Sequence, residues 1–584
     1  MKKRVITGIL FLSIVGAIYA VPAKRTIHTV VQADGSRLEI RINGDERENY
    51  FSTTDGFPIV KGDDGLFYYL LPSGEAGREC SVRQAHNPGE RTADEQLFLQ
   101  DFPLELWTAQ RQNYRREKAA SELTRMGEMP VTKGSPNIPV LLIAFQNRAF
   151  TDENPNEAYQ RRLCRPATRE EIENREGSAF QYFHDQSNGM FTPNFVVIGP
   201  VTLDKEDVYY GENDLYGLDL RAGEMISEAI QKAEAGGLVE DWSIFDNNQD
   251  GTVDVTYALY AGEGANISTE ANLIWPHQST LSSKSIPSPE MDNVRFDAYG
   301  CNNELMFGKI DGFGTFCHEF SHCLGLPDFY PTVSGVEVFG MDYWSLMDFG
   351  SYKCDGYIPV GYTAYEKEFL GWKELKVLAA PTTVTALKTT ADGGEGYKIV
   401  NPKSVNEYYI LETVDNSGWN KGNYAQGLLV THVNYNAQTW KNNTVNNNIR
   451  MPGVSIIPAD NDLTVLVRGS NEYEYESSLK GDLYPSPDGN NSLTDNSTPS
   501  AEVYVGLSGY MSQPITDIAY DAESRTTSFN FMGGDAQSVP SISDMTNLPA
   551  NYYHPDGRKA KIPLQRGIYL QQIIGGSTRK VIVR

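Results

Sequence analysis

The sequence predicts a multi-domain protein that combines an α/β domain with β-rich parts on either side of it. Its 584 residues exceed what one hydrophobic core usually supports. Short stretches that alternate apolar and polar residues, separated by Asn-Gly and Asp-Gly pairs, are typical of β-hairpins. We therefore expect a β-rich N-terminal unit, a central α/β domain and a C-terminal β-sandwich.

The first twenty residues have the pattern of a secretory signal peptide. Three basic residues precede an apolar run that ends at the small residue Ala20. A membrane anchor is the alternative interpretation, but the run is short for a bilayer span and contains two glycines. We expect residues 1–20 to be removed, which predicts a secreted or cell-surface protein without stable membrane insertion.

Residues 21–134 are expected to be a β-rich pro-region or accessory unit with a helical connector. Hairpin signals run from Thr26 to about Leu71, and a charged stretch that favours helix follows. Cleavage near Arg115-Arg116, or in the stretch with Pro and Gly residues that follows, would remove this unit as a pro-region. A permanent accessory domain fits the same residues, and both interpretations stay open.

The net charge of the chain excludes one class of partner. Its 76 acidic and 50 basic side chains give a formal charge of -26. Such a field repels phosphate backbones and anionic membranes. Nucleic acid is therefore not an expected partner.

The central domain is predicted to span residues 135–375. One motif in it holds most of the candidate functional residues. The motif HEFSH, residues 318–322, places His318 and His322 four positions apart. That spacing puts both imidazoles on one face of a helix, where they can hold one zinc ion. Glu319 lies beside them and is suited to take a proton from the water on the metal rather than to bind it.

Two residues beyond this helix complete the predicted site. Gly325 falls where the helix should end, because glycine readily adopts the left-handed conformation that turns the chain back. Asp328 can then be the third protein ligand. Hydrolytic zinc sites keep three protein ligands, so the fourth position is left to water.

These residues carry a family resemblance. HEFSHCLGLPD, from His318 to Asp328, resembles the extended metzincin motif in the form found in immune inhibitor A-like secreted zinc metallopeptidases, where Asp replaces the usual third His. The segment YWSLM, which ends at Met347, resembles the Met-turn of that family. The resemblance covers about residues 135–530 and implies a metzincin-like α/β catalytic domain.

The resemblance also implies roles for residues near the metal. Met347 is expected to be a hydrophobic floor beneath the zinc ligands and not a ligand itself. Tyr352 and Tyr343 are candidates for support of the oxyanion, although a structural role explains both equally well.

The function that this resemblance implies is zinc-dependent hydrolysis of internal peptide bonds in protein or peptide substrates. A secreted binding protein that keeps the fold and the metal but lacks turnover is one alternative. A surface adhesin, in which the metal only braces the fold, is another. Glu319 argues against the first alternative, because a binding protein needs no general base at that position. Binding that survives Glu319→Ala without any proteolysis would favour the adhesin.

Residues 246–254 are predicted to form a structural calcium loop. Oxygen-bearing side chains recur at alternate positions, and Gly251 allows a sharp turn. An EF-hand would carry a bidentate Glu at its twelfth position, where this chain has Tyr257. An Asx-rich turn without an ion is the alternative. The candidate ligands are Asp246, Asn248, Asp250, Thr252 and Asp254.

The rest of the chain divides into three predicted parts. Strand-like runs alternate with Asn, Gly and Asp turns over residues 376–532, which predicts the β-sandwich. Residues 533–547 are a small-polar linker. The tail, residues 548–584, resembles the C-terminal sorting segments of type IX secretion cargo, which the secretion machinery would recognise. An edge hairpin of the sandwich is the alternative for this tail.

Overall fold

The computed structural model describes most of the chain. Both the signal peptide predicted for residues 1–20 and the cleavage site predicted near Arg115-Arg116 lie outside the described residues. None of the described helices has the length and apolar character needed to cross a membrane. The described residues are 21–71, 80–104, 107–108, 111, 131–214, 217–333, 339–465, 472–505, 509–534, 550–553, 567–573 and 578–583.

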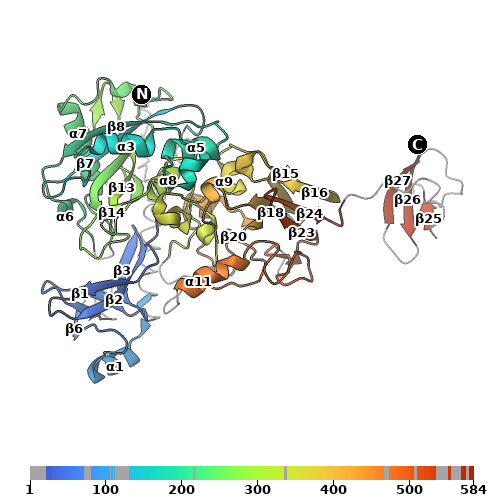
Figure 1. The fold of residues 1–584 in the computed structure, drawn as a ribbon, viewed down its shortest axis with the longest axis horizontal. Helices are drawn as coiled ribbons and strands as arrows, with labels where there is room; N and C mark the ends of the chain where they lie inside the picture. Colours follow the sequence, from blue (N-terminus) through green and yellow to red (C-terminus); the bar gives the residue numbers. More distant parts are fainter. Residues whose placement is uncertain are drawn as a thin grey trace, which may run out of the picture.

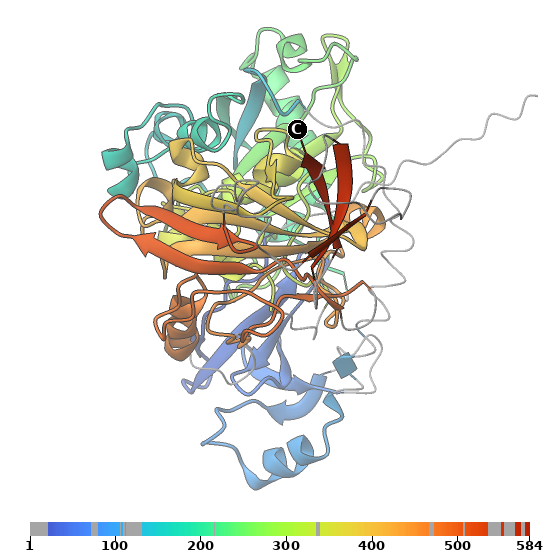
Figure 2. The same ribbon diagram turned by 90° about the vertical axis from the view of Figure 1, so that its right-hand side faces the viewer.

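The chain is a mixture of helices and several separate sheets, as the sequence predicts (Figure 1). The N-terminal unit is a six-stranded antiparallel meander, and it lies below the central domain in Figures 1 and 2. Helix α1 (Ala93–Gln100) follows it and begins at a capping box formed by Thr92 and Glu95. The strands are β1 (His28–Val31), β2 (Arg37–Asp45), β3 (Glu48–Thr53), β4 (Pro58–Lys61), β5 (Phe67–Leu70) and β6 (Cys80–Gln84).

The central domain is built on a sheet with the strand order β10-β13-β9-β7-β8. Its inner pairs, β13 with β9, β9 with β7 and β7 with β8, are parallel, whereas β10 is an antiparallel edge. The strands are β7 (Asn137–Ala144), β8 (Asn194–Thr202), β9 (Thr256–Glu263), β10 (His277–Thr280) and β13 (Ala298–Met306), and β14 (Lys309–Ile310) pairs with β13.

The continuous apolar run in β7 is explained by the burial of both faces of this strand. Val140 and Leu142 contribute to one hydrophobic core, and Leu141 and Ile143 contribute to the other. Helix α8 (Gly314–Cys323) packs in the first core and α7 (Ala222–Ala235) in the second. The remaining helical segments are α3 (Pro155–Leu163), α4 (Arg169–Glu173), α5 (Ala179–Gln186), α6 (Asp207–Tyr210), η2 (Trp242–Phe245), η3 (Asp342–Trp344), η4 (Phe349–Gly356) and α9 (Ala364–Phe369).

Two further sheets follow the central domain. The first has the order β15-β17-β18-β19-β20 and the second the order β16-β24-β23. They share a core to which Leu411, Val430 and Phe529 contribute. These strands are β15 (Lys376–Val377), β16 (Thr382–Leu387), β17 (Tyr397–Asn401), β18 (Ser404–Val414), β19 (Gly427–Asn434), β20 (Val454–Ile456), β23 (Ile515–Asp521) and β24 (Thr526–Phe531).

The first of these sheets also packs against the central domain. Tyr409 and Leu411 of β18 point into the shared core of the two sheets, whereas Tyr408 and Ile410 belong to the core that contains α8. The first C-terminal sheet is therefore joined to the core of the central domain by buried apolar contacts. Short elements between the strands include η6 (Gly418–Asn420), α10 (Ala437–Lys441), α11 (Glu472–Ser478) and η7 (Leu479–Gly481).

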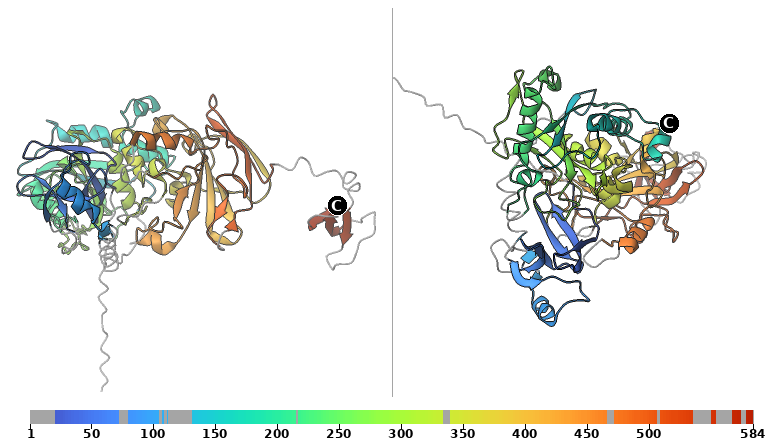
Figure 3. Two further views of the ribbon diagram at one scale, coloured as in Figure 1. Left: turned by 90° about the horizontal axis from the view of Figure 1, so that it is seen from below. Right: turned by 60° about the vertical axis from the view of Figure 1, so that its left-hand side comes forward.

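The described part of the tail forms a small sheet of its own. Strands β25 (Ala550–Tyr553), β26 (Gly567–Ile573) and β27 (Thr578–Val583) pair with one another and stand apart in Figures 1 and 3. The described strands of the tail thus do not extend either of the two preceding sheets. Most of the predicted linker and part of the predicted sorting segment lie outside the described residues.

Candidate metal centre

Helix α8 carries both predicted histidine ligands, and all of its residues are buried. Its first residue, Gly314, lies so close to the carbonyl oxygen of Ser351 that a Cβ would clash with it. Beyond the helix, Gly325 has φ +96°, which is the left-handed conformation predicted from the sequence. The chain then turns back and brings Asp328 to the histidines.

The three predicted ligand atoms converge on one point. The Nε2 atoms of His318 and His322 lie 3.1 Å apart. Oδ1 of Asp328 lies 3.3 Å from the first nitrogen and 3.2 Å from the second. Among the described residues, no other set of three His, Cys, Asp or Glu side chains has ligand atoms gathered this closely.

Backbone carbonyls orient both imidazole rings. Nδ1 of His318 lies 2.7 Å from the carbonyl oxygen of Leu346, and Nδ1 of His322 lies 2.7 Å from that of Leu326. Because a carbonyl oxygen only accepts hydrogen bonds, each Nδ1 carries the proton. Each Nε2 then presents a lone pair to the shared point, as a metal ligand must.

The turn that ends at Met347 supplies one of these carbonyls. Met347 is fully buried, and its backbone N–H donates to the hydroxyl of Ser345 at 3.0 Å. That hydroxyl donates to Glu366 at 2.7 Å. The turn is thereby fixed so that the carbonyl of Leu346 faces His318.

Asp328 is positioned by a residue that the sequence did not reveal. Its backbone N–H donates to Oδ1 of Asn443 at 2.7 Å, and the amide of Asn443 donates to Oδ2 of Asp328. Oδ1 of Asp328 is buried and accepts no hydrogen bond. Burial raises the pKa of Asp328, but His322 and His318 lower it by more, so the pKa is shifted downward overall. Oδ1 of Asp328 therefore faces both Nε2 atoms without a hydrogen-bond donor of its own, as a metal-binding oxygen would.

Glu319 lies beside this group on α8 and is also completely buried. Its Oε1 accepts a hydrogen bond of 2.6 Å from the backbone N–H of Val21, and its Oε2 has no partner in the described chain. Burial raises the pKa of Glu319 well above its ordinary value, and Asp328 and Glu46 raise it further. A carboxyl with a raised pKa suits proton transfer near neutral pH.

Comparison with known proteins identifies the domain that holds this group. Residues 141–375 match the catalytic domain of the immune inhibitor A peptidase M6 family. The domain belongs to this family. The match includes the three ligand candidates, Glu319 and the turn at Met347, so the resemblance to the immune inhibitor A family is confirmed over residues 141–375.

Two relatives of this M6 domain show how far the likeness extends. The chain is 27% identical over 211 residues to the pre-pro-metalloprotease PrtV of Vibrio cholerae serotype O1, which covers 32% of this chain and 23% of that protein. It is 26% identical over 215 residues to immune inhibitor A of Bacillus thuringiensis subsp. alesti, covering 32% and 31% of the two chains. The alignments thus span less than a third of the length of these relatives.

The segment that begins at Val21 lies against Glu319. The sequence did not predict this contact. Val21 is fully buried, and its carbonyl accepts a hydrogen bond of 2.9 Å from the indole N–H of Trp275. The carbonyl of Pro22 accepts one of 2.6 Å from the hydroxyl of Tyr352. Residues 21–25 therefore occupy the space in front of Glu319.

The two tyrosine candidates differ in position. Tyr352 is buried, and its hydroxyl also accepts a hydrogen bond of 2.9 Å from the side chain of Asn266. The ring of Tyr343 packs against Phe349 and Tyr424, with ring centroids 6.2 and 5.4 Å apart. The hydroxyl of Tyr352 therefore contacts a main-chain carbonyl of the segment that lies against Glu319.

The predicted calcium loop is partly exposed, and its carboxylate oxygens bond mainly to groups of the loop itself. Oδ1 of Asp246 accepts a hydrogen bond from the backbone N–H of Asp250, and its Oδ2 accepts one from Gly251. Oδ1 of Asp250 accepts one from Thr252 at 2.9 Å. Asn248 and Asp254 also bond within the loop, the first to Asp250 and the second to Asn247. The calcium site stays a prediction.

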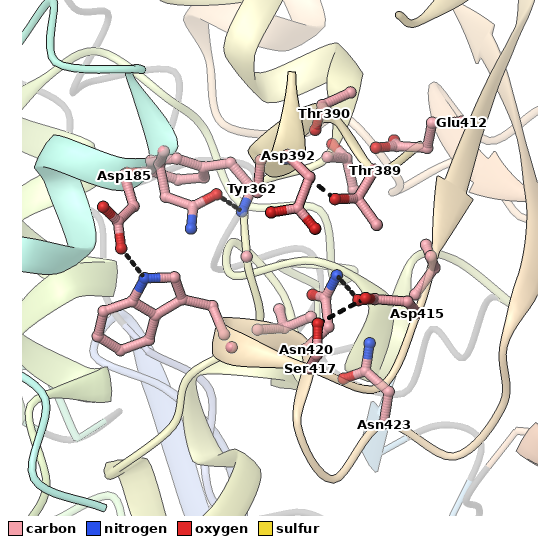
Figure 4. A pocket seen from close by; sticks show the side chains of 18 of the residues that line it. Asp185, Tyr362, Thr389, Thr390, Asp392, Glu412, Asp415, Ser417, Asn420 and Asn423 are labelled. Atoms are coloured by element: carbon pink, nitrogen blue, oxygen red, sulfur yellow. Dashed lines mark hydrogen bonds between the residues drawn. The ribbon is translucent and has the colours of Figure 1, made fainter. Parts of the chain in front are cut away.

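A separate cavity of about 430 Å³ lies between the M6 domain and the C-terminal sheets. Figure 4 shows Asp185 bonded to the indole of Trp419, and the backbone N–H of Tyr362 bonded to the side chain of Gln186. None of the three ligand candidates lines this cavity, and neither does Glu319. It is therefore distinct from the candidate metal centre.

Proposed function

We propose that the protein is a secreted zinc-dependent metalloendopeptidase that hydrolyses internal peptide bonds of proteins. One observation carries this proposal. Two imidazole nitrogens and one carboxylate oxygen converge in a buried group, next to a carboxyl with a raised pKa, in a domain of the M6 family. A metal held by such ligands beside a proton acceptor is the arrangement that metal-assisted hydrolysis requires.

The chemistry of the ligands fits zinc. His318, His322 and Asp328 would hold the ion, because two imidazoles and one carboxylate in a three-ligand site are a ligand set found in hydrolytic zinc enzymes. Zinc bound there would polarise the scissile carbonyl and lower the pKa of a water.

Glu319 is proposed to move the proton. It would accept a proton from the attacking water and deliver it to the nitrogen of the leaving amine. Its hydrogen bond with the backbone nitrogen of Val21 supports this role, because the nitrogen of the residue that follows a cleaved bond would lie in the same place against Oε1. Tyr352 is proposed to support the oxyanion, since its hydroxyl donates to a peptide carbonyl in the same cleft.

The N-terminal unit is proposed to be a pro-region that keeps the enzyme latent. A substrate cannot reach Glu319 while Val21 occupies it, and the buried contacts of residues 21–25 favour a pro-region over a permanent accessory domain. We propose that export removes residues 1–20 and that later cleavage releases the rest of residues 21–134.

The remaining assignments are proposals as well. The catalytic domain would span residues 135–375, the β-sandwich residues 376–532, and the tail, residues 548–584, would be an address for type IX secretion after a linker at 533–547. A structural calcium ion in the loop 246–254 is retained as a proposal, with Thr252 among its ligands. A metzincin-like fold of the catalytic domain is supported by the order of helix, glycine turn and Met-turn.

The experiment that tests this function is cleavage of unfolded casein by the protein. Wild type is compared with Glu319→Ala and with a chelated sample that is then reloaded with zinc, and the metal content of each is determined. We expect cleavage only by zinc-loaded wild type. A folded, zinc-loaded wild type that cleaves nothing after release of the N-terminal unit would favour a binding protein instead.

A further inference from the structure

Arg25 of the N-terminal segment is held by a set of acidic and aromatic side chains, which we call the arginine pocket. Nη1 of Arg25 donates a hydrogen bond of 2.8 Å to Oδ2 of Asp342 and one of 3.2 Å to the hydroxyl of Tyr475. The guanidinium lies 3.6 Å from the ring centroid of Phe349 and 5.7 Å from that of Tyr475. Aromatic rings beside a carboxylate suit a planar guanidinium better than an ammonium group.

The pocket contains more carboxyl groups than Arg25 binds directly. Oδ2 of Asp348 accepts a hydrogen bond of 2.8 Å from the backbone N–H of Asp342, and its buried Oδ1 has no partner in the described chain. Asp348 is 3% exposed.

The energetics of these groups favour a cation in the pocket. Burial raises the pKa of Asp348 well above its ordinary value, Asp342 raises it further, and Arg25 opposes the shift. Burial in turn disfavours the charge of Arg25, but Asp342 and Asp348 raise the pKa of its guanidinium. Removal of Arg25 leaves buried carboxyls without their cation, which is costly.

The contact between Val21 and Glu319 sets the position of this pocket along a substrate. The general base delivers its proton to the nitrogen of the residue that follows the cleaved bond. The nitrogen of Val21 faces Glu319, so Val21 corresponds to that residue and Arg25 to the fifth residue after the bond. The segment is also held as a bound peptide would be, with the N–H of Lys24 donating to the carbonyl of Asn266 at 3.1 Å.

We propose that this pocket, formed by Asp342, Asp348, Phe349 and Tyr475, selects substrates with an arginine at the fifth residue after the cleaved bond. The proposal rests on the proposed peptidase function and names its substrate class. In the zymogen Arg25 fills the pocket, and in the active enzyme an arginine of the substrate replaces it.

Lys24 provides the contrast within the same segment. Its Nζ lies 3.8 Å from Oδ1 of Asp355, a carboxylate whose side chain is 61% exposed, and 3.5 Å from the sulfur of Met306. An ion pair with an exposed carboxylate contributes little to binding. Lys24→Gln is therefore the matched control for Arg25→Gln.

The first test compares two quenched peptides that differ at one position. One carries arginine at the fifth residue after the cleaved bond, and the other carries citrulline, which has the same shape without the charge. We expect kcat/KM to be about tenfold higher for the arginine peptide, chiefly through KM, because one charge-assisted contact is lost. In Asp342→Asn the ratio should fall to about one.

The outcomes separate this proposal from the proposed function. Cleavage of casein together with equal rates for the two peptides overturns the pocket and leaves the peptidase standing. A preference that persists in Asp342→Asn also overturns it. Failure of the zinc-loaded protein to cleave casein or either peptide overturns both.

A second measurement does not depend on turnover. Hydrogen exchange of residues 21–25 is followed in the full-length chain for wild type, Arg25→Gln and Lys24→Gln. We expect exchange to accelerate about tenfold in Arg25→Gln and to stay near the wild-type rate in Lys24→Gln. Equal exchange in the two variants contradicts an anchoring pocket for arginine.

Discussion

The group of His318, His322 and Asp328 and the acidic loop at 246–254 were both predicted from residue type and spacing to bind a metal, but their surroundings are opposite. In the group around His318, every ligand atom is buried, and the second polar atom of each side chain is bonded elsewhere. In the loop, the oxygens of Asp246 and Asp250 accept hydrogen bonds from backbone N–H groups of the loop itself. Residue type and spacing can predict a metal site. Whether the candidate ligand atoms meet at one point depends on the hydrogen bonds that orient their side chains.

The largest expected effect comes from removing one ligand in each region. His322→Ala leaves two protein ligands, so we expect hydrolysis of casein to fall at least about 10³-fold, which is the scale of losing the metal's contribution. Asp250→Asn in the loop should leave casein hydrolysis within about twofold of wild type. Initial rates on casein measure both. Equal losses would mean that the loop takes part in catalysis and would break the comparison.

A smaller effect is expected from the residue that positions Asp328. Asn443→Ala leaves all three ligands but removes the contacts with the backbone and side chain of Asp328. Zinc affinity should fall about 10- to 100-fold, as is usual when a group that orients a ligand is lost. Competition with a chromophoric chelator measures it. The control is Asn442→Ala, whose side chain bonds to Gln438 instead; an equal loss there would contradict a positioning role.

Buried carboxyls without metal-ligand neighbours should respond to pH in the opposite direction from Asp328. Burial raises the pKa of Asp311 to about 7, and its Oδ1 has no partner among the described residues. The stability that it contributes is fully present below the unfolded pKa of about 4 and is lost as the pH rises through 7. We expect Asp311→Asn to raise Tm at pH 8 by several degrees. At pH 4 the gain should vanish in thermal unfolding scans, and a gain equal at both values would show that titration is not its cause.

The smallest expected effect is that of calcium on the loop. If an ion joins the oxygens of the loop, calcium should raise the Tm of zinc-loaded protein by a few degrees through binding to the folded state. Asp246→Asn should abolish the shift. Thermal unfolding with zinc held constant measures both. An identical Tm with and without calcium would leave the loop as an Asx-rich turn.

The sequence predicted the part of the site that is local in the chain. His318, His322, Gly325 and Asp328 lie within eleven positions, so helical geometry and one glycine turn suffice to relate them. Asn443 and Val21 could not be found in this way. They lie 115 residues from Asp328 and 298 residues from Glu319, respectively, and their contacts arise only from the packing of whole domains.

Prediction of the fold from the sequence was limited in the same way. Asp-Gly and Asn-Gly pairs mark local turns, so the hairpins of the N-terminal meander were predictable. The apolar run 408–411 indicated a strand, and it lies in β18. That alternate residues of β18 enter two different cores could not be read from the run, because a strand buried on both faces looks the same whatever covers it.

The most direct test of the account is the zinc stoichiometry of the purified protein, measured by plasma mass spectrometry for wild type and Asp328→Asn. We predict one zinc per chain in wild type and a large loss of zinc in the variant, with the fold unchanged. The reason is that the oxygen that faces both histidines no longer carries a charge in Asp328→Asn. Equal zinc in the two proteins, or a zinc-free wild type that still cleaves casein, would contradict the assignment of the metal centre.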